Sequence, residues 1–346
     1  MENLTKRQEA ILKIISGANK PILTSEIENS ITKIYDMSRD TIVRDLNALK
    51  EAGLISSNNS GPSTTYYLTN TLLTPVDTNI YFSTAQDNRT LINEPNSEFF
   101  DKISRTELIA NSRLNHKITE YRKKVSDLPL DIHARELERF VIDLAYKSSA
   151  IEGNTYSLLE TEQLIKNAKR VDGKTEMEAI MILNHKTTFD IIMDNLVSFK
   201  QLNLSDILNI HQSLVRGLDI DTGIRKHAVG ISGTNYKPLD NQFSLKENLE
   251  RAITITNQKT NPIEKALVIS GLIAYLQPFG DGNKRTARMV ANAILLAFSI
   301  APISYRNIDE IEYKKSIILI DEQHDFYYYK NIFTESIEFS LNNYQV

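Results

Sequence analysis

The sequence of 346 residues contains no cysteine and no tryptophan. The absence of cysteine excludes disulfides, thiolate metal sites and cysteine nucleophiles, and it fits a reducing cytoplasm. The chain also has no large excess of either charge: it contains 40 Lys and Arg and 44 Asp and Glu, which gives a net charge of −4. A strong basic field over the whole molecule is therefore excluded, and any contact with nucleic acid must come from a local patch.

Long hydrophobic runs are also missing. The longest apolar stretch, 289–303, is interrupted by Asn292 and Ser299, and it falls short of the ~20 residues that a membrane-spanning helix needs. The first ten residues lack the apolar core and cleavage site of a signal peptide. Hydrophobic residues still make up 41% of the chain. We therefore expect a folded cytoplasmic protein without membrane contact, divided into two domains because one domain takes ~100–200 residues.

The first 70 residues have the pattern of three short helices. Apolar residues recur at helical spacing in 4–16. Thr24 is a suitable N-cap for a second helix and Ser38 for a third, which Gly53 should end. We expect the apolar side of the third helix to carry Ile42, Val43, Leu46 and Leu49.

A small hairpin should follow these helices, formed by a short apolar run at 54–55 and an alternating strand at 64–68. Three helices and a hairpin resemble a winged helix-turn-helix, which we assign to residues 1–70. Residues 71–95 are polar, contain Pro75 and Pro95, and predict a linker. Beyond them almost every segment has helical period, so the fold class is predicted as mainly α.

In a winged helix-turn-helix, the third helix would enter the major groove of DNA. Arginine can bind guanine, asparagine can bind adenine, and serine or threonine can bind phosphate. The candidate DNA-binding residues are Ser38, Arg39, Thr41, Arg44 and Asn47. Residues 1–70 carry eight basic and eight acidic side chains, a balance of zero. Such a unit would bind DNA weakly as a monomer, so we expect a homodimer; a unit that docks protein without DNA is the alternative.

A glycine-rich turn joins two apolar helices, one opening with Asn261-Pro262 and one starting at about Asn283. The free amides and the dipole at the start of the second helix favour phosphate. Three cations, Lys284, Arg285 and Arg288, oppose that dipole, a conflict that a bound polyanion would remove. Asp281 adds one carboxylate, which suits a Mg²⁺ ion that keeps several waters. A helix–turn–helix with a solvated basic start remains the alternative.

The segment from Gln277 to Arg288, QPFGDGNKRTAR, resembles the signature of the Fic family, H-x-F-x-(D/E)-G-N-(G/K)-R-x-x-R, at every position except the first. Residues 148–154, SSAIEGN, resemble the inhibitory motif of the family. Residues 225–238 resemble its flap hairpin, and 207–214 one of its core helices. The resemblance implies a Fic domain at 96–346, helical with a small β-hairpin flap, and an inhibitory helix near 139–154.

The resemblance also implies roles for single residues. Family members typically transfer AMP from ATP to a protein hydroxyl, so ATP with Mg²⁺ is the expected ligand and Asp281 the metal ligand. The implied nucleotide-binding residues are Asp281, Gly282, Asn283, Lys284, Arg285 and Arg288. Arg288 would pair with Glu152 in the inhibited state and bind the γ-phosphate otherwise; Ser148 and Gly153 complete the inhibitory motif. Phe279 would anchor the turn in the core.

The flap would offer an exposed strand edge to an extended segment of a target protein; an ordinary surface hairpin is the alternative. The implied target-docking residues are Val229, Ile231, Gly233 and Tyr236. No histidine lies in the turn, and the acidic stretch 321–325, DEQHD, is expected to be a solvated loop rather than a metal cluster.

Two departures from the family bear on the reaction. Gln277 stands at the position of the histidine that serves as general base, and an amide accepts no proton at neutral pH. The catalytic position is therefore predicted to be inactive. Lys284 stands where most AMP-transferring members have glycine. The same Asn-Lys-Arg occurs in the phosphate-transferring Doc branch and in other relatives, so it does not decide the reaction.

Two functions are consistent with these patterns. The first is a nucleotide-binding transcriptional regulator, built on a degenerate Fic core with impaired AMP transfer. The second is an autoinhibited protein adenylyltransferase in which the winged helix selects targets. Gln277 favours the first, and the otherwise intact turn favours nucleotide binding in both.

Overall fold

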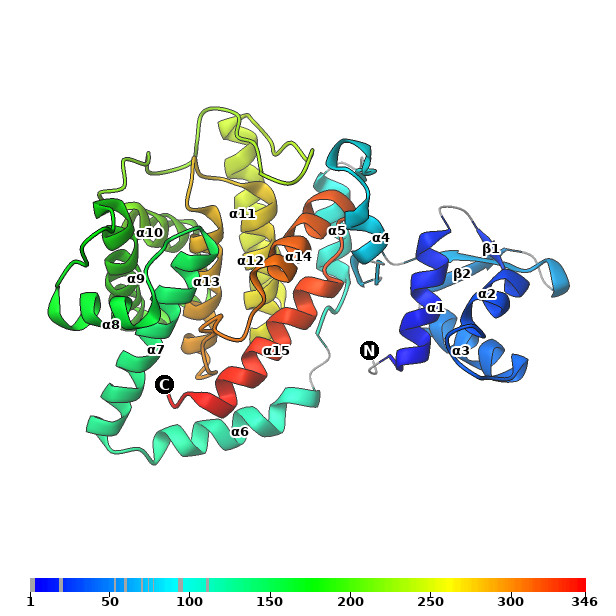
Figure 1. Cartoon of the computed structure of the whole chain (residues 1–346), viewed down its shortest axis with the longest axis horizontal. Helices are drawn as coiled ribbons and strands as arrows, with labels where there is room; N and C mark the ends of the chain where they lie inside the picture. The colour runs from blue at the N-terminus through cyan, green and yellow to red at the C-terminus, as the bar shows by residue number, and fades with distance from the viewer. Residues whose placement is uncertain are drawn as a thin grey trace.

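The computed structural model describes residues 4–346 except 19–20, 53, 59–60, 70, 74, 77, 93–95 and 110–111. The described residues form a small N-terminal unit and a large helical body, each with its own hydrophobic core. Figure 1 shows the small unit at one end of the molecule, beside α4 and α5 of the larger body.

The N-terminal unit consists of α1 (Lys6–Gly17), β1 (Ile22–Leu23), α2 (Thr24–Ile31), α3 (Arg39–Glu51), β2 (Ile55–Asn58) and β3 (Thr65–Leu68). The strands form an antiparallel sheet in the order β1-β3-β2, in which Ile22 pairs with Tyr66 and Ile55 with Leu68. The helices and the hairpin thus occur in the predicted order, and Ile11, Ile27 and Leu46 fill the core between them.

Helix starts in this unit differ from the expected ones. Thr24 is the first residue of α2 rather than its cap, and its hydroxyl donates to the Thr64 carbonyl. The amide before it is satisfied by the carboxylate of Glu26, at 3.0 Å. Ser38 does precede α3, but its hydroxyl lies 3.0 Å from that of Thr41 and caps no amide. The hydroxyl of Thr24 is thus taken by a backbone carbonyl and that of Ser38 by a neighbouring side chain, so neither caps a helix.

The apolar side of α3 was also predicted wrongly at one residue. Val43 is 37% exposed, whereas Asp45 is buried. The Asp45 carboxylate accepts a hydrogen bond from Arg7 Nε of α1 at 3.0 Å, and this pairing makes burial of the acid possible. The predicted stop at Gly53 lies outside the described residues; α3 ends at Glu51.

The segment expected to be a linker contains η2 (Thr71–Leu73), α4 (Thr78–Ser83) and η3 (Gln86–Asn88). Leu72 and Leu73 are buried in the large core, and the amide of Ile92 donates to the carbonyl of Glu322 at 2.8 Å. Much of this segment therefore packs on the helical body.

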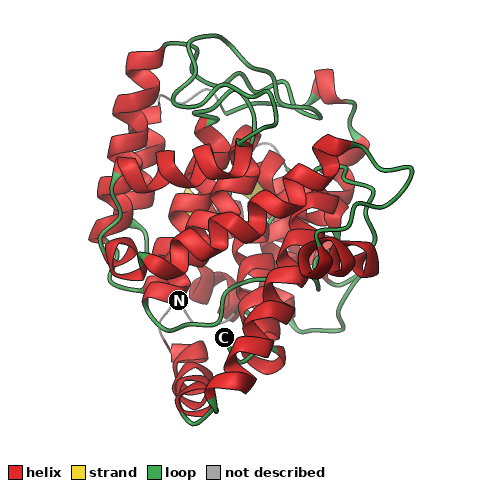
Figure 2. Cartoon of the chain, turned by 90° about the vertical axis from the view of Figure 1, so that its left-hand side faces the viewer, coloured by secondary structure: helices red, strands yellow, loops and turns green. Residues whose placement is uncertain are grey.

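The helical body contains α5 (Asn96–Arg105), α6 (Ser112–Ser126), α7 (Leu130–Ile151), α8 (Leu158–Asn167), α9 (Glu176–Asp194), η4 (Leu196–Lys200), α10 (Leu204–Val215), α11 (Gln242–Gln258), α12 (Pro262–Leu276), α13 (Asn283–Ala297), α14 (Glu310–Gln323) and α15 (Tyr327–Asn343). The predicted mainly α class is confirmed (Figure 2). The two helices around the glycine-rich turn, α12 and α13, are almost entirely buried at the centre of the body (Figure 1).

The predicted β-hairpin flap is absent, because residues 216–241 between α10 and α11 contain no strand. An isolated two-stranded hairpin is only marginally stable. Here Arg225 binds the segment instead, since its guanidinium donates to the carbonyls of His227 and Leu239. The flap is therefore an extended loop. None of the helices in the described part of the chain is long and apolar enough to cross a membrane.

Candidate nucleotide site at the start of α13

Local sequence signals shape the turn between α12 and α13. The Asn261 side chain caps α12 by accepting the amide of Ile263 at 2.9 Å, with Pro262 at the first helical position. Gly282 precedes α13 with φ of 79°. A Cβ atom there would lie 3.0 Å from Val215 Cγ1, so both the backbone angle and the close approach of α10 require glycine. As predicted, α13 begins at Asn283.

Side chains of α10 and α13 hold the turn in place. Phe279 is fully buried and stacks on His211 of α10, with ring centroids 3.8 Å apart. His211 Nε2 lies 3.0 Å from the carbonyl of Asp281 and must carry the proton, because a carbonyl only accepts. Burial lowers the pKa of His211 to about 4, which keeps it neutral. The side chain of Asn283 closes the turn: its Oδ1 accepts from the amide of Phe279 and its Nδ2 donates to the carbonyl of Phe279, both at 2.9 Å.

The first turn of α13 contains buried donors without partners. Arg285 is 3% exposed, and its Nη1 makes no hydrogen bond in the described residues. The buried hydroxyl of Thr286 is also unpaired there. Burial lowers the pKa of Arg285, because the charged form is desolvated. Unpaired buried donors are costly, and together with the helix N-terminus they fit an anionic ligand such as phosphate.

Asp281 is the one carboxylate of this turn, and its side chain is 70% exposed. One of its oxygens accepts the amide of Gly282 at 2.5 Å, and the other lies 3.4 Å from Arg285 Nη2. No cluster of three metal-ligating side chains occurs among the described residues. A Mg²⁺ ion here would therefore take its other ligands from phosphate and water, as this ion commonly does.

The predicted inhibitory residues meet Arg288, which is fully buried. Its Nε donates to the hydroxyl of Ser148 and its Nη2 to the carbonyl of Ser148, both at 2.9 Å. Nη2 also lies 2.8 Å from the carboxylate of Glu152. Gly153 follows with φ of 93° and ends α7. The structure thus brings Ser148 and Glu152 to the helix that starts at the turn, whereas Gly153 follows the end of α7.

Charges in this region stabilise one another. Although burial raises the pKa of Glu152, the charges of Arg288 and Lys284 outweigh it, and the pKa is lowered. Conversely, burial lowers the pKa of Arg288, but the carboxylate of Glu152 raises it above its ordinary value. Both groups are therefore charged at neutral pH.

Gln277 ends α12 in the left-handed region, with φ of 47°. Its side-chain amide donates to the carbonyl of Ala274 at 2.6 Å, and its own carbonyl accepts from Arg225 Nε at 2.7 Å. Arg225 also donates its amide to the carbonyl of Pro278. Arg225 therefore fixes the turn to the flap. The sequence analysis did not predict this role for Arg225.

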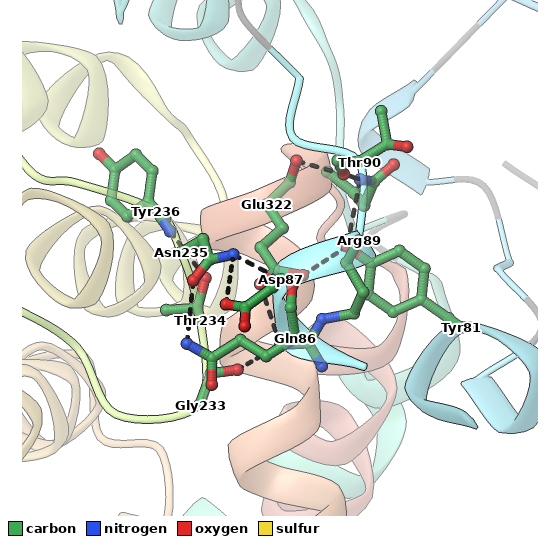
Figure 3. Close-up of polar contacts among 11 residues, drawn as sticks. Tyr81, Gln86, Asp87, Arg89, Thr90, Gly233, Thr234, Asn235, Tyr236 and Glu322 are labelled. Atoms are coloured by element: carbon green, nitrogen blue, oxygen red, sulfur yellow. Dashed lines mark hydrogen bonds and ion pairs between the residues drawn. The ribbon is translucent and has the colours of Figure 1, made fainter. Parts of the chain in front are cut away.

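The flap does not present the free strand edge that we predicted. Figure 3 shows that the 81–90 segment lies against it. The side-chain amide of Asn235 accepts from the Gln86 side chain and donates to the Gln86 backbone carbonyl, and the carbonyl of Gly233 accepts from Arg89. Of the predicted docking residues, Val229 and Ile231 are half-buried and Gly233 is exposed. Tyr236 stacks on Tyr275, with ring centroids 4.8 Å apart.

The acidic stretch 321–325 is not a solvated loop, which corrects the prediction. Asp321, Glu322, His324 and Asp325 are all buried. Glu322 accepts from Arg89 at 3.2 Å and from the hydroxyl of Tyr81 at 2.5 Å. Burial raises the pKa of Asp321 well above its ordinary value, while the charge of Lys284 acts against this rise. Tyr81 and Arg89 lie 241 and 233 positions before Glu322 in the sequence. The sequence alone therefore contains no signal of these two contacts.

The predicted DNA-binding residues lie along α3. Arg44 and Asn47 are exposed, together with the acidic Asp40 and Glu51. Arg39 is exposed but pairs with Glu28 of α2 at 2.9 Å. Ser38 is exposed, and its partner Thr41 is half-buried. The side chains available to a ligand on this face are thus chiefly those of Arg44 and Asn47.

The site thus consists of a buried helical hairpin whose second helix begins at an anion-type turn and carries an arginine paired to an earlier helix. Residues 201–295 match the model of the Fic/DOC family. The chain therefore contains a Fic/DOC family domain, which includes the turn, the flap and α13 up to Leu295.

Curated relatives named protein adenylyltransferase Fic are similar to part of the chain. The protein from Nematostella vectensis is 26% identical over 231 residues, covering 62% of this chain and 49% of its own length. The protein from Aedes aegypti is 28% identical over 183 residues, covering 52% and 36%. The chain thus spans half or less of the length of these relatives.

Solved structures share the fold. A fragment of Fic-1 from C. elegans superposes with a TM-score of 0.55 at 21% identity, covering 71% of this chain and 72% of the fragment. A Fic-domain signaling protein from Bacteroides thetaiotaomicron gives a TM-score of 0.56 at 18% identity, covering 66% and 93%.

Proposed function

We propose that the chain binds ATP with Mg²⁺ at the turn before α13, and that Glu152 competes with the nucleotide for Arg288. The observation that carries this proposal is the set of buried donors at one helix start. Arg285 Nη1 and the hydroxyl of Thr286 have no partner in the described residues, and Arg288 is neutralised by Glu152. Phosphate would satisfy the first two, and its outermost group would take the place of the carboxylate.

In this proposal Asp281 holds the Mg²⁺ ion, which would neutralise phosphate charge. Gly282 and Asn283 keep the backbone amides of the turn open to the phosphates. Lys284 and Arg285 supply positive charge beside them.

The test is ligand-induced stabilisation. A ligand that prefers the native state raises stability by RT ln(1 + [L]/Kd), so ATP with Mg²⁺ should raise the melting temperature. The Glu152→Gly variant should show a larger rise, because Arg288 is freed. Glu107→Gly removes an exposed carboxylate from a loop and should respond as the unmodified chain does. No shift in any of these forms would refute nucleotide binding.

For the N-terminal unit, we propose that it is a winged helix-turn-helix that binds DNA through α3, and that the chain is a dimeric transcriptional regulator with impaired AMP transfer. Two observations support the proposal: Arg44 and Asn47 are exposed on α3, and Gln277 cannot act as a base. The regulator would act in the cytoplasm, with nucleotide occupancy as its signal.

The second candidate is an autoinhibited protein adenylyltransferase whose N-terminal unit selects protein targets. The names of the curated relatives favour it. In that case a target would dock on the flap, and the contacts of Gln86 and Arg89 with the flap would have to open first. Label transfer from ATP to protein by the unmodified chain would favour this candidate over the regulator.

A further inference from the structure

Ser148 of α7 lies between two buried side chains from other helices. Its hydroxyl oxygen is 2.9 Å from Nε of Arg288 on α13 and 2.8 Å from Nε2 of His185 on α9. The exposed fraction is 0% for Ser148 and Arg288 and 1% for His185. His185 was not among the residues that the sequence analysis singled out.

The hydrogen-bond donors in this chain of contacts can be assigned from chemistry alone. Nδ1 of His185 lies 2.8 Å from the carbonyl of Met181, one helical turn earlier. A carbonyl only accepts, so Nδ1 carries the proton and Nε2 presents its lone pair. The Ser148 hydroxyl must then donate to His185, which leaves its oxygen free to accept from Arg288 Nε.

With this assignment, Ser148 accepts two hydrogen bonds from the guanidinium of Arg288. The Ser148 hydroxyl takes Nε and the Ser148 carbonyl takes Nη2. Glu152 shares only Nη2, and its side chain is 23% exposed. The serine contacts are therefore fully enclosed, whereas the carboxylate reaches solvent and is the contact that a ligand would replace.

We propose that His185 is a positioning residue: by accepting the proton of Ser148, it fixes the guanidinium of Arg288 so that Nη2 faces either Glu152 or an anionic group of a bound nucleotide. The proposal rests on the proposed nucleotide site and adds a residue to it. The rings of Tyr305 and Tyr313, whose centroids lie 5.8 Å and 6.0 Å from the guanidinium carbon, support the same orientation.

Neutral histidine suits this role for an electrostatic reason. Burial lowers the pKa of His185 to about 3, and the charges of Arg285 and Arg288 act in the same direction. The carbonyl of Met181 and the charge of Glu152 oppose the change without reversing it. The imidazole therefore keeps its Nε2 lone pair at neutral pH. A protonated imidazole would instead donate from Nε2 to the Ser148 hydroxyl, and its charge would repel Arg288.

The binding test uses the full chain carrying Glu152→Gly, in which Arg288 is not occupied by the carboxylate. Ser148→Ala in that background should weaken ATP–Mg²⁺ binding about tenfold, the effect of losing one hydrogen bond to a charged group. His185→Phe removes the neutral acceptor of the Ser148 hydroxyl and should weaken binding about fivefold. Ser148→Thr keeps the hydroxyl and should restore affinity. His116→Phe replaces an exposed histidine of α6 and should change nothing. Unchanged affinity in the His185 and Ser148 variants would overturn the positioning role.

A spectroscopic measurement on the chain without substitutions keeps the proposal testable if a variant fails to fold. Nitrogen-15 spectra of the imidazoles should show His185 neutral at about pH 7, protonated at Nδ1, with an Nε2 signal typical of a hydrogen-bond acceptor. Protonation at Nε2 would refute the assignment. If the Glu152→Gly chain binds no ATP, the proposed function fails and the positioning role with it, whereas the spectrum still decides the Ser148–His185 contact.

Discussion

The carboxylate of Glu152 lies 2.8 Å from Nη2 of Arg288 and joins the end of α7 to the helix that starts at the candidate nucleotide site. The two residues are 136 positions apart in the sequence. Because Arg288 is fully buried, its charge requires a partner at all times. The carboxylate of Glu152 fills that place in this structure, so its contact with Arg288 contributes to stability.

The first prediction follows from the lowered pKa of Glu152. Glu152→Gln should cost about 2 kcal/mol of unfolding free energy at neutral pH, because a charged hydrogen bond to a buried arginine is lost. A carboxyl whose folded pKa lies below its unfolded value stabilises the fold above the unfolded pKa, 4.5 for this group. That contribution is lost as the pH falls through the folded value.

Urea denaturation over a series of pH values checks this prediction. The stability difference between the two chains should be constant above about pH 6 and should shrink in acid. Glu162→Gln, at a half-buried carboxylate of α8 paired with Lys166 on the surface, serves as the control and should cost almost nothing at any pH. A difference that does not change with pH would mean that Glu152 is not ionised against Arg288.

The second prediction concerns the missing general base. The unmodified chain, given labelled ATP and a lysate, should transfer little or no label to protein. Gln277→His combined with Glu152→Gly should raise labelling by ~10²–10⁴, the range that a general base contributes. Histidine tolerates the left-handed backbone at this position. Glu152→Gly alone is the matched control, and equal labelling by both variants would contradict the role assigned to position 277.

The third prediction concerns the contact between the 81–92 segment and the flap. Arg89 bridges the carbonyl of Gly233 and the buried carboxylate of Glu322, at 3.2 Å from the latter. The side chains of Arg89 and Glu322 are 7% and 0% exposed. Arg89→Ala should therefore destabilise the chain by about 3 kcal/mol, because it leaves a buried charge unpaired.

The control for this prediction is Arg251→Ala, which breaks a surface pair with Asp101 and should cost at most about 1 kcal/mol. Urea denaturation measures both. In addition, limited proteolysis should cut the Arg89→Ala chain within 81–92 before the unmodified chain. Equal losses in the two variants would show that the segment contributes no more than a surface contact.

The sequence predicted the turn well because its signals are local. The Asn261-Pro262 start, the glycine before Asn283 and the apolar helices on either side act within a few residues of one another. Burial of Glu322 could not be predicted, since its partner Arg89 lies 233 positions away. Asp45 was missed for the same reason: a helical pattern shows which side is apolar, but not that Arg7 of another helix neutralises the acid.

The flap was predicted as a hairpin because residues 225–238 resemble the flap segment of the family. Side-chain preference does not supply a partner strand, and Arg225 satisfies the carbonyls in its place. The position of His185 was equally hidden. Its role depends on the meeting of α7, α9 and α13 at Ser148, which no periodicity within one helix reveals.

The last prediction concerns DNA and tests the proposed role of α3. A dimer should bind an inverted repeat whose half-sites lie one or more helical turns apart. Because residues 1–70 have no net charge, few phosphate contacts are expected. Affinity should then fall only modestly with salt, with a shallower slope than that of a basic repressor. A mobility-shift assay with the DNA upstream of the chain's own coding sequence is the direct measurement.

A variant in α3 and a control outside α3 locate the contact. Arg44→Ala should weaken binding by about 1–3 kcal/mol and relax specificity at one position if Arg44 contacts a base, or weaken binding evenly across sequences if it contacts phosphate. Lys33→Ala, at an exposed position outside α3, should leave specificity unchanged. If no sequence is retained at low salt, with or without ATP, α3 binds protein instead, and the autoinhibited adenylyltransferase becomes the better account of the chain.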